Sequence, residues 1–142
     1  MADTPFALAR AFGIWLTLVA VESLHGVMRR VLLERRLGDL PARQVSVLTG
    51  AVLILLVFWF TLRWLGLQSK RRWWGIGLLW LTLTVAFEIG LGRAAGMSWD
   101  RIASDFDPRR GGFLGLGMLV ILVAPRVLAE RLGLIPGRRQ TA

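Results

Sequence analysis

Hydrophobic residues are concentrated in four long runs, which are separated by short segments rich in arginine. We place these runs at residues 6–28, 45–67, 75–92 and 112–134. Each approaches the ~20 residues that a helix needs to cross about 30 Å of hydrocarbon. The runs show no strand-like alternation, and a backbone within lipid must satisfy its own hydrogen bonds, so we predict helices. Pro125 is expected to end or kink the fourth helix. The expected fold is an all-α integral membrane protein: one domain, a bundle of four transmembrane helices.

Composition supports this class. Of the 142 residues, 55% are hydrophobic and 19% are charged, whereas soluble domains carry about 25% charged residues. The chain has no Cys, which excludes disulfides and thiolate metal sites. The first run is too long, and its start too poor in positive charge, for a cleaved signal peptide. Most of the net charge of +9 comes from residues outside the runs. We therefore expect the lipid bilayer and its anionic headgroups as partners, and no nucleic acid.

An even number of spans places both termini on one side of the membrane, which we call side A. Side A also carries the QSKRRWW turn, and side B carries the two longer loops. The 18 Lys and Arg residues divide equally between the sides, so the positive-inside rule does not decide the orientation. The compact SKRR and GRRQ clusters favour side A as the cytoplasmic side. We expect a location in a bacterial inner membrane with cytoplasmic termini.

Both side-B loops have features of interfacial helices. The first loop, RRVLLERRLGDLPARQ, mixes leucines with arginines, as a helical extension in the membrane interface would. In the third loop Ser98 is a plausible N-cap for WDRIASDF, and Pro108 and Gly111 stop that helix. The third-loop residues that we expect at the interface are Trp99, Asp105, Asp107 and Arg109. The tryptophans expected to anchor side A are Trp64, Trp73 and Trp74.

Three ionisable residues within the apolar runs are candidates for burial in the membrane: Glu22, His25 and Glu88. Such residues cost about 2.5–3.5 kcal/mol each at the centre of a membrane helix, and they usually face the bundle interior and carry function. At ~1.5 Å per residue, both carboxyl groups lie about 8–10 Å below the side-B surface. Glu22, His25 and Arg29 follow an i, i+3, i+7 pattern, which forms one stripe on the first helix.

The other helices bring small and polar residues to the same depth. Thr49 lies on the second helix and Thr84 on the third, one turn from Glu88, while Arg29 and Arg93 are the nearest cations. We call Glu22, His25, Thr49, Thr84 and Glu88 the polar layer. The glycines expected to admit a close neighbour there are Gly26, Gly90, Gly92, Gly111 and Gly115.

Three functions fit this pattern. In the first, the polar layer is open to water and binds or translocates a small solute, a cation or a proton, with His25 in a proton relay. In the second, Glu22, His25, Glu88 and an arginine form a closed structural network in a non-transporting subunit or assembly factor that docks a membrane-protein partner. In the third, a membrane enzyme acts on a lipidic substrate with Glu22 or Glu88 as acid or base. We expect the first, a non-enzymatic role, in a homo-oligomer, because four helices alone enclose little interior.

A metal site is a weaker hypothesis. Glu22 and His25 form an E-x-x-H unit, which together with Glu88 is half of a di-iron carboxylate set. A twofold dimer would have to complete it. We predict no bound metal and no cofactor.

A first-helix carboxylate followed by glycine, Glu22 to Gly26, resembles the small multidrug-resistance exporters, in which such a glutamate binds protons and cationic drugs in alternation. The resemblance covers only these five residues. His25, Glu88 and the larger side-B loops are additions to that family's pattern, so the resemblance implies proton-coupled exchange as an analogy and assigns no family.

Overall fold

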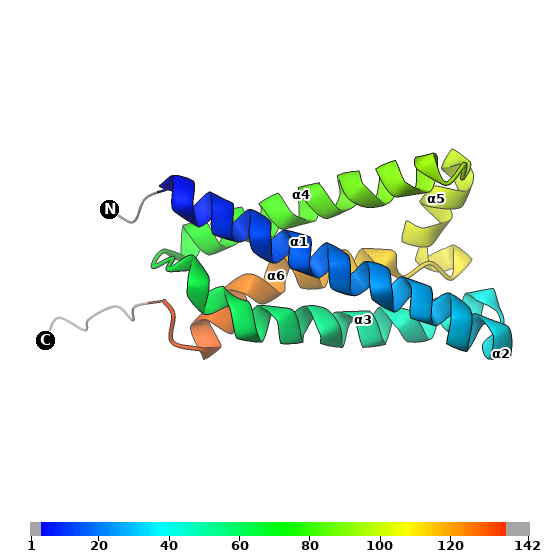
Figure 1. The fold of residues 1–142 in the computed structure, drawn as a ribbon, viewed down its shortest axis with the longest axis horizontal. Coiled ribbons are helices and arrows are strands. Elements are labelled where there is room, and N and C mark those ends of the chain that lie inside the picture. The colour runs from blue at the N-terminus through cyan, green and yellow to red at the C-terminus, as the bar shows by residue number, and fades with distance from the viewer. Residues whose placement is uncertain (1–3, 136–142) are drawn as a thin grey trace, which may run out of the picture.

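The structure, a computed structural model, describes residues 4–135, which form a bundle of helices (Figure 1). The helical elements follow in this order: α1 (Thr4–Met28), the π-helix η1 (Arg29–Glu34), α2 (Arg35–Leu37), α3 (Asp39–Thr61), the 3₁₀ turn η2 (Leu62–Leu65), α4 (Lys70–Ala94), α5 (Trp99–Phe106), the 3₁₀ turn η3 (Pro108–Arg110) and α6 (Leu114–Arg131). No strand occurs between residues 4 and 135. The all-helical prediction is confirmed.

The four long helices α1, α3, α4 and α6 run alternately in opposite directions along the long axis (Figure 1). Helix α1 therefore begins, and α6 ends, at side A. Helix α6 packs against both α3 and α4, and α1 packs mainly against α3. Helices α1 and α4 touch over a short stretch only. They cross near side A and separate toward side B (Figure 1).

Three helical segments are long and apolar enough to cross a membrane: Phe6–Leu37, Asp39–Leu65 and Lys70–Ala94. Only 22% of the most apolar stretch of each is buried inside the molecule. Most of the apolar surface of these helices therefore faces outward, as it does in a helical membrane protein.

Helix α6 occupies the fourth predicted span but is not one of the three segments long and apolar enough to cross a membrane. It has 18 residues, with Pro125 inside it and Arg126, Glu130 and Arg131 at its end. The helix does not end at Pro125, so Arg126 lies within it. The Arg126 guanidinium donates a 2.9 Å hydrogen bond to Glu130 and lies over the ring of Trp74. Its charge is therefore directed along the helix toward side A.

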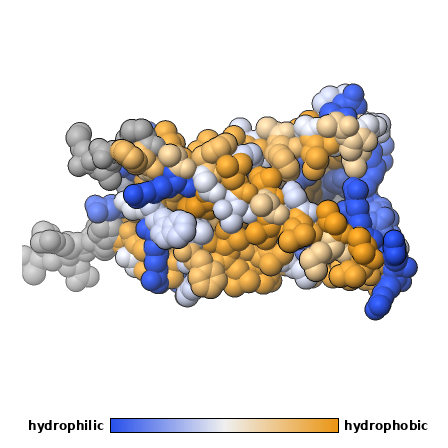
Figure 2. Space-filling view, in the orientation of Figure 1, coloured by the Kyte–Doolittle hydropathy of each residue, from blue (hydrophilic) through white to orange (hydrophobic). Residues whose placement is uncertain are grey.

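The face of the molecule seen in Figure 2 has an apolar middle and polar ends. Large side chains such as Leu24, Leu48 and Phe60 are 63%, 72% and 70% exposed. None of the buried residues between positions 6 and 135 is polar or charged, glycine apart. The apolar interior is common to soluble proteins, but the large exposed apolar surface is the reverse of a soluble fold and is what a lipid environment favours.

The buried core lies mostly in the side-A half of the bundle. Trp80 stacks on Phe58 with ring centroids 5.0 Å apart, and both are fully buried. Trp73 is also fully buried, and its indole donates a 3.1 Å hydrogen bond to the carbonyl oxygen of Leu67. The prediction that Trp73 anchors the interface is therefore wrong. Trp64, at 66% exposed, and Trp74, at 42%, remain on the surface.

The first helix continues nine residues beyond its predicted end, because helical structure runs through Met28 to Leu37. Residues Arg29–Glu34 adopt a π-helix, and the chain turns at Gly38, whose φ of +82° favours glycine. The predicted interfacial helix of the first loop is thus a direct continuation of α1.

The predicted helix of the third loop is present as α5, and Ser98 caps it by accepting a hydrogen bond from the Arg101 amide at 3.2 Å.

Gly77 sets the closest approach between two helices. A Cβ atom at this position would overlap the backbone carbonyl of Leu122 on α6. This glycine was not among the five expected to admit a close neighbour, which included Gly26 and Gly90. A Cβ at either of those would meet no described atom within 4 Å, so that expectation is wrong for both.

Candidate functional site

The Glu22 and His25 side chains lie together on α1, on the face that packs against α3. Glu22 Oε2 is 3.4 Å from His25 Nδ1, and His25 Nε2 is 2.8 Å from Thr49 Oγ1 on α3. The i, i+3 spacing places the carboxyl and the imidazole one turn apart on α1. Thr49 meets them because α3 runs antiparallel to α1. Three residues of the predicted polar layer therefore form one chain of contacts.

Gly50 provides the space for this arrangement. It is buried, and a Cβ atom there would lie 2.9 Å from Glu22 Oε2 and 3.5 Å from the His25 ring. Any larger residue would push the carboxyl away from its position. The close approach of α1 and α3 at this level thus depends on the small size of residue 50.

The Thr49 hydroxyl links the proton on His25 to the backbone. Its oxygen is 3.3 Å from the carbonyl oxygens of both Val45 and Ser46, and the hydroxyl has one hydrogen to donate. In the first arrangement the Thr49 hydroxyl donates to a backbone carbonyl and accepts a hydrogen bond from Nε2–H of His25. A second proton then lies between His25 Nδ1 and the Glu22 carboxyl. In the second arrangement the hydroxyl donates to Nε2, so the only proton on the pair is on Nδ1, where it faces the Glu22 carboxylate. The same contacts are therefore compatible with two protonation states.

The hydrogen-bonding capacity of this cluster is not used up by the described protein atoms. Glu22 Oε1 and Ser46 Oγ are enclosed, and neither has a hydrogen-bond partner within residues 4–135. Enclosed polar atoms usually have a partner, and an exception points to strain, function or a bound species. The site therefore has capacity for a proton, a water molecule or a polar solute.

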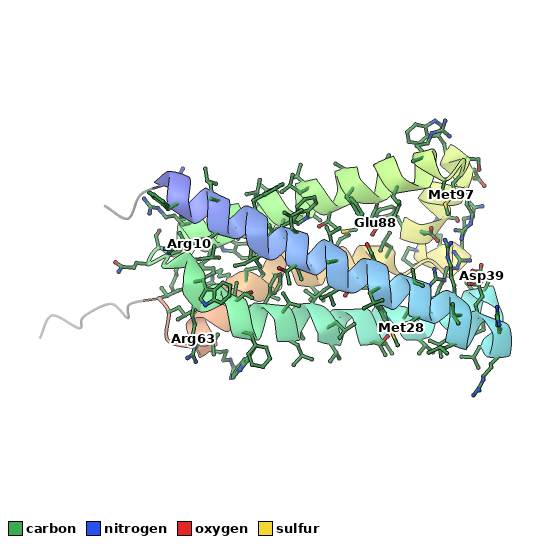
Figure 3. The ribbon with its side chains drawn as sticks, viewed as in Figure 1. Arg10, Met28, Asp39, Arg63, Glu88 and Met97 are labelled. Atoms are coloured by element: carbon green, nitrogen blue, oxygen red, sulfur yellow. The ribbon has the colours of Figure 1, made fainter. Side chains whose placement is uncertain are left out.

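Glu88 lies on α4, in the side-B half of the bundle, between α4 and α1 as seen in Figure 3. Its side chain is partly buried and is close enough to Glu22 and Asp105 to interact with both electrostatically. Among the described residues it makes no hydrogen bond or ion pair that would neutralise it. Glu22 and Glu88 are consistent with the one layer inferred from their depths.

The predicted cations of the layer lie elsewhere. Arg93 donates a 2.8 Å hydrogen bond to the carbonyl oxygen of Met97, and its guanidinium lies 4.9 Å from the ring centroid of Trp99. Arg29 extends toward Glu34 and Asp39, at 4.0 and 3.9 Å. Both arginines are thus directed toward the side-B surface and away from Glu22.

The Thr84 hydroxyl also has a partner away from Glu22 and His25. Its hydroxyl oxygen accepts a 3.1 Å hydrogen bond from the indole of Trp15 on α1. Thr84 therefore holds α4 against α1 at the side-A boundary of the layer.

The third loop is organised around Asp105, which contacts two arginines. One, Arg101, lies one turn earlier on α5 at 2.7 Å, and the other, Arg43, lies near the start of α3. Arg43 also pairs with Asp39 at 2.7 Å. This cluster ties the first loop to the third above the polar layer. The i, i+4 spacings of Asp39 with Arg43 and of Arg101 with Asp105 can be read from the sequence. The contact between Arg43 and Asp105 cannot.

The other predicted loop residues have separate roles. Trp99 is 63% exposed at the start of α5. Asp107 accepts a 2.9 Å hydrogen bond from the amide of Arg109 and so caps the short turn that follows, and Arg109 itself is exposed.

Within residues 4–135, no three His, Asp or Glu side chains come close enough together to hold one metal ion. Glu22, His25 and Glu88 therefore do not form such a group within a single chain.

The fold and site define a class: a helical protein with three helices that can cross a membrane and a carboxyl–imidazole cluster between two of them. Comparisons with protein-family models, curated protein sequences and solved structures give no match.

Proposed function

We propose that this chain is a four-span protein of the bacterial inner membrane, with α6 as the fourth span and both termini in the cytoplasm. The position of α6 supports this, because it packs along α3 and α4 inside the apolar part of the bundle. The lipid bilayer and its anionic headgroups are the proposed partners.

Labelling of single cysteines tests this topology, because the chain has no Cys of its own. Gln68→Cys lies before α4 on side A, and Ala95→Cys lies after α4 on side B, and both positions are exposed. A membrane-impermeant maleimide should label Ala95→Cys in intact cells and Gln68→Cys only in opened cells. A C-terminal reporter should be on the same side as Gln68. A reporter on the side of Ala95 would exclude α6 as a span.

The proposed function is to bind, and exchange across the membrane, a proton or a small cationic solute at the polar layer. The observation that carries this proposal is the chain of contacts from Glu22 through His25 to Thr49, in which one enclosed carboxyl oxygen lacks a partner. Glu88 adds a second carboxyl near the first. A cation that enters between the two carboxyl groups is attracted by both when they are ionised. Loss of a proton from a carboxyl group supplies the negative charge that binds the cation.

The alternative of a closed structural network is less well supported. Such a network needs the carboxyls to be satisfied by nearby cations. The arginines that the sequence offered, Arg29 and Arg93, make their contacts elsewhere. A non-transporting subunit or assembly factor would also leave the unpartnered Glu22 oxygen without explanation.

Substitution of the carboxyls tests the proposal. Glu22→Gln and Glu88→Gln keep the side-chain size and remove the charge. In liposomes containing the purified protein, each should abolish the proton flux driven by a gradient of a small lipophilic cation such as tetraphenylphosphonium. Glu130→Gln, on side A and outside the layer, is the matched control and should retain it. If Glu22→Gln and Glu88→Gln only lower thermal stability and the flux is unchanged, the structural network is correct.

A homo-oligomer is part of this proposal, because the four helices of one chain enclose little space. Native mass spectrometry in mild detergent should show a complex of two or more copies. A monomer under all detergent conditions, with full activity in liposomes, would reject it.

A second candidate function, an enzyme acting on a lipid, is favoured by one observation. Thr49, with Leu48, Val52 and Leu53, lines an apolar cavity of about 360 Å³ on the outer surface of α3. Carboxyl, imidazole and hydroxyl follow one another here in the order of an acyl-transfer triad. Thr49 would attack an acyl carbonyl while His25 takes the hydroxyl proton and then gives it to the leaving alcohol.

An acyl-transfer role has a direct test. A fluorophosphonate probe should label the wild-type protein and Thr49→Ser, and should not label Thr49→Val or His25→Gln. The absence of labelling in the wild-type protein, together with intact cation exchange, would reject the enzyme and leave the first proposal standing.

A further inference from the structure

A cavity of about 490 Å³ lies at side B, where α1 passes into the π-helix η1. All of its lining residues are ionisable: Arg29, Arg30, Glu34, Arg35, Asp39 and Arg101. Four are cations and two are anions, so the cavity is electropositive. π-Helical segments occur often at functional sites, and here the segment supplies half of the lining.

The two acids offset only part of the positive charge of the four arginines. Asp39 is engaged at 2.7 Å by Arg43, which does not line the cavity. Arg29 approaches Glu34 and Asp39 only at 4.0 and 3.9 Å, beyond hydrogen-bond distance. Its Nη1 is enclosed and has no hydrogen-bond partner among residues 4–135. Arg29 therefore has donors that these two carboxylates leave unsatisfied.

The three other arginines of the cavity also have N–H donors that no described residue uses. Arg30 and Arg35 are exposed, and in the part of the chain that the structure describes neither forms a hydrogen bond or an ion pair through its side chain. Arg101 uses one terminal nitrogen on Asp105 and keeps the rest of its guanidinium. Several guanidinium groups with unused N–H donors thus surround one cavity.

This arrangement matches the chemistry of a phosphate group. The planar guanidinium donates two parallel hydrogen bonds to phosphate oxygens, and several such groups can share one phosphate. A carboxylate has fewer oxygens to share. We propose that the cavity binds a phosphate group, as the diester of an anionic phospholipid in the side-B leaflet or as a soluble phosphate compound.

The surroundings of the cavity place it within reach of lipid headgroups. Val31, Leu32 and Leu37 on the same helical extension are 49%, 55% and 48% exposed and face the exterior. A segment with apolar residues outside and arginines at the cavity suits the boundary between hydrocarbon and headgroups. The site is separate from the Glu22 carboxyl and does not depend on the proposed exchange function.

Binding to defined ligands tests the proposal. Delipidated protein in a non-ionic detergent is titrated with phosphatidylglycerol, with phosphatidylcholine, and with inorganic phosphate against chloride at equal ionic strength. Native mass spectrometry counts the bound lipid, and thermal unfolding reports the stabilisation. Phosphatidylglycerol should bind at least about tenfold more tightly than phosphatidylcholine, or inorganic phosphate should stabilise the protein where chloride does not. The first outcome identifies a lipid and the second a soluble phosphate.

The exposed arginines give a variant that should still fold. Arg30→Gln combined with Arg35→Gln should weaken binding of the phosphate ligand by about tenfold or more, because charge-assisted hydrogen bonds are lost. Arg36→Gln is the matched control: it lies beside Arg35 on α2 and is exposed, but does not line the cavity. Equal binding by the double variant and Arg36→Gln would overturn the proposal. So would equal binding of both lipids without any effect of inorganic phosphate.

Discussion

The indole of Trp80 on α4 donates a 2.8 Å hydrogen bond to the carbonyl oxygen of Ala11 on α1. One turn nearer to side B on each helix, Trp15 makes the reverse connection by donating to Thr84. Toward side B from these two bonds, α1 and α4 separate (Figure 1). The pair of tryptophans thus fixes the angle between two helices, and this angle sets how far Glu22 lies from Glu88.

Replacement of Trp80 by Phe should lower stability by about 1–2 kcal/mol, because the hydrogen bond and part of a fully buried ring are lost while stacking on Phe58 is kept. Thermal unfolding in detergent measures the change. Trp64→Phe, at a residue 66% exposed, should have little effect. Equal losses in the two variants would show that the buried hydrogen bond contributes nothing specific.

Gly77→Ala should destabilise the bundle by about 2–3 kcal/mol, because the added methyl group overlaps the Leu122 backbone and neither helix can move without repacking the core. The control lies half a turn away. A Cβ at Gly75 meets no described atom within 4 Å, so Gly75→Ala should be neutral or should stabilise α4 by about 0.5–1 kcal/mol. Chemical unfolding of both variants decides the matter, and a stable Gly77→Ala protein would contradict the observed packing of α4 on α6.

The ion pair of Asp100 and Arg110 should give a small, pH-dependent contribution to stability. Arg110 donates two hydrogen bonds of 2.9 Å to the carboxylate and thereby lowers the pKa of Asp100 below its usual value of 3.8. A depressed pKa stabilises the folded state above the usual value, and this stabilisation is lost as the pH falls through the lower, folded-state value. Asp100→Asn should therefore lower the Tm by about 1–2 °C at pH 7, and the difference should disappear once the pH is below the lowered, folded-state pKa of Asp100.

A double variant provides the control for this ion pair. If the two residues act only on each other, Asp100→Asn combined with Arg110→Gln should unfold at the same temperature as either single variant. Additive losses would mean that each residue has another partner.

The sequence predicted the helices and the height of each polar residue, because both follow from hydrophobic run length and a fixed rise per residue. The depth of a residue in the membrane does not determine in which direction its side chain points around the helix axis. Arg29 and Arg93 lie at the expected level toward side B, yet their side chains are directed to Asp39 and Trp99. The pairing of Glu22 with His25 could be predicted because both lie on one helix.

Contacts between distant segments could not be predicted from one sequence. Arg43 contacts Asp105, which is 62 residues away in the sequence. Gly75 and Gly77 lie on the same helix, but only Gly77 faces α6. The π-helix of Arg29–Glu34 has no composition that separates it from an ordinary helix, so the predicted end at residue 28 was too early. In each case tertiary packing selects among local arrangements that the sequence permits equally.

Gly50→Ala tests the site without changing any ionisable group. The new methyl group would lie 2.9 Å from Glu22 Oε2, and because that atom ends a flexible side chain, the carboxyl should move and the fold should survive. His25 is the only histidine in the chain, so selective ¹⁵N labelling gives one imidazole whose signals report its protonation. We expect altered His25 signals and cation-driven proton flux reduced about tenfold or more, since misplacement of a reacting group by a fraction of an ångström is costly. Gly26→Ala, beside His25 but facing open space, should behave as the wild type. Wild-type signals and flux in Gly50→Ala would mean that the contact between Glu22 and His25 is not needed for exchange.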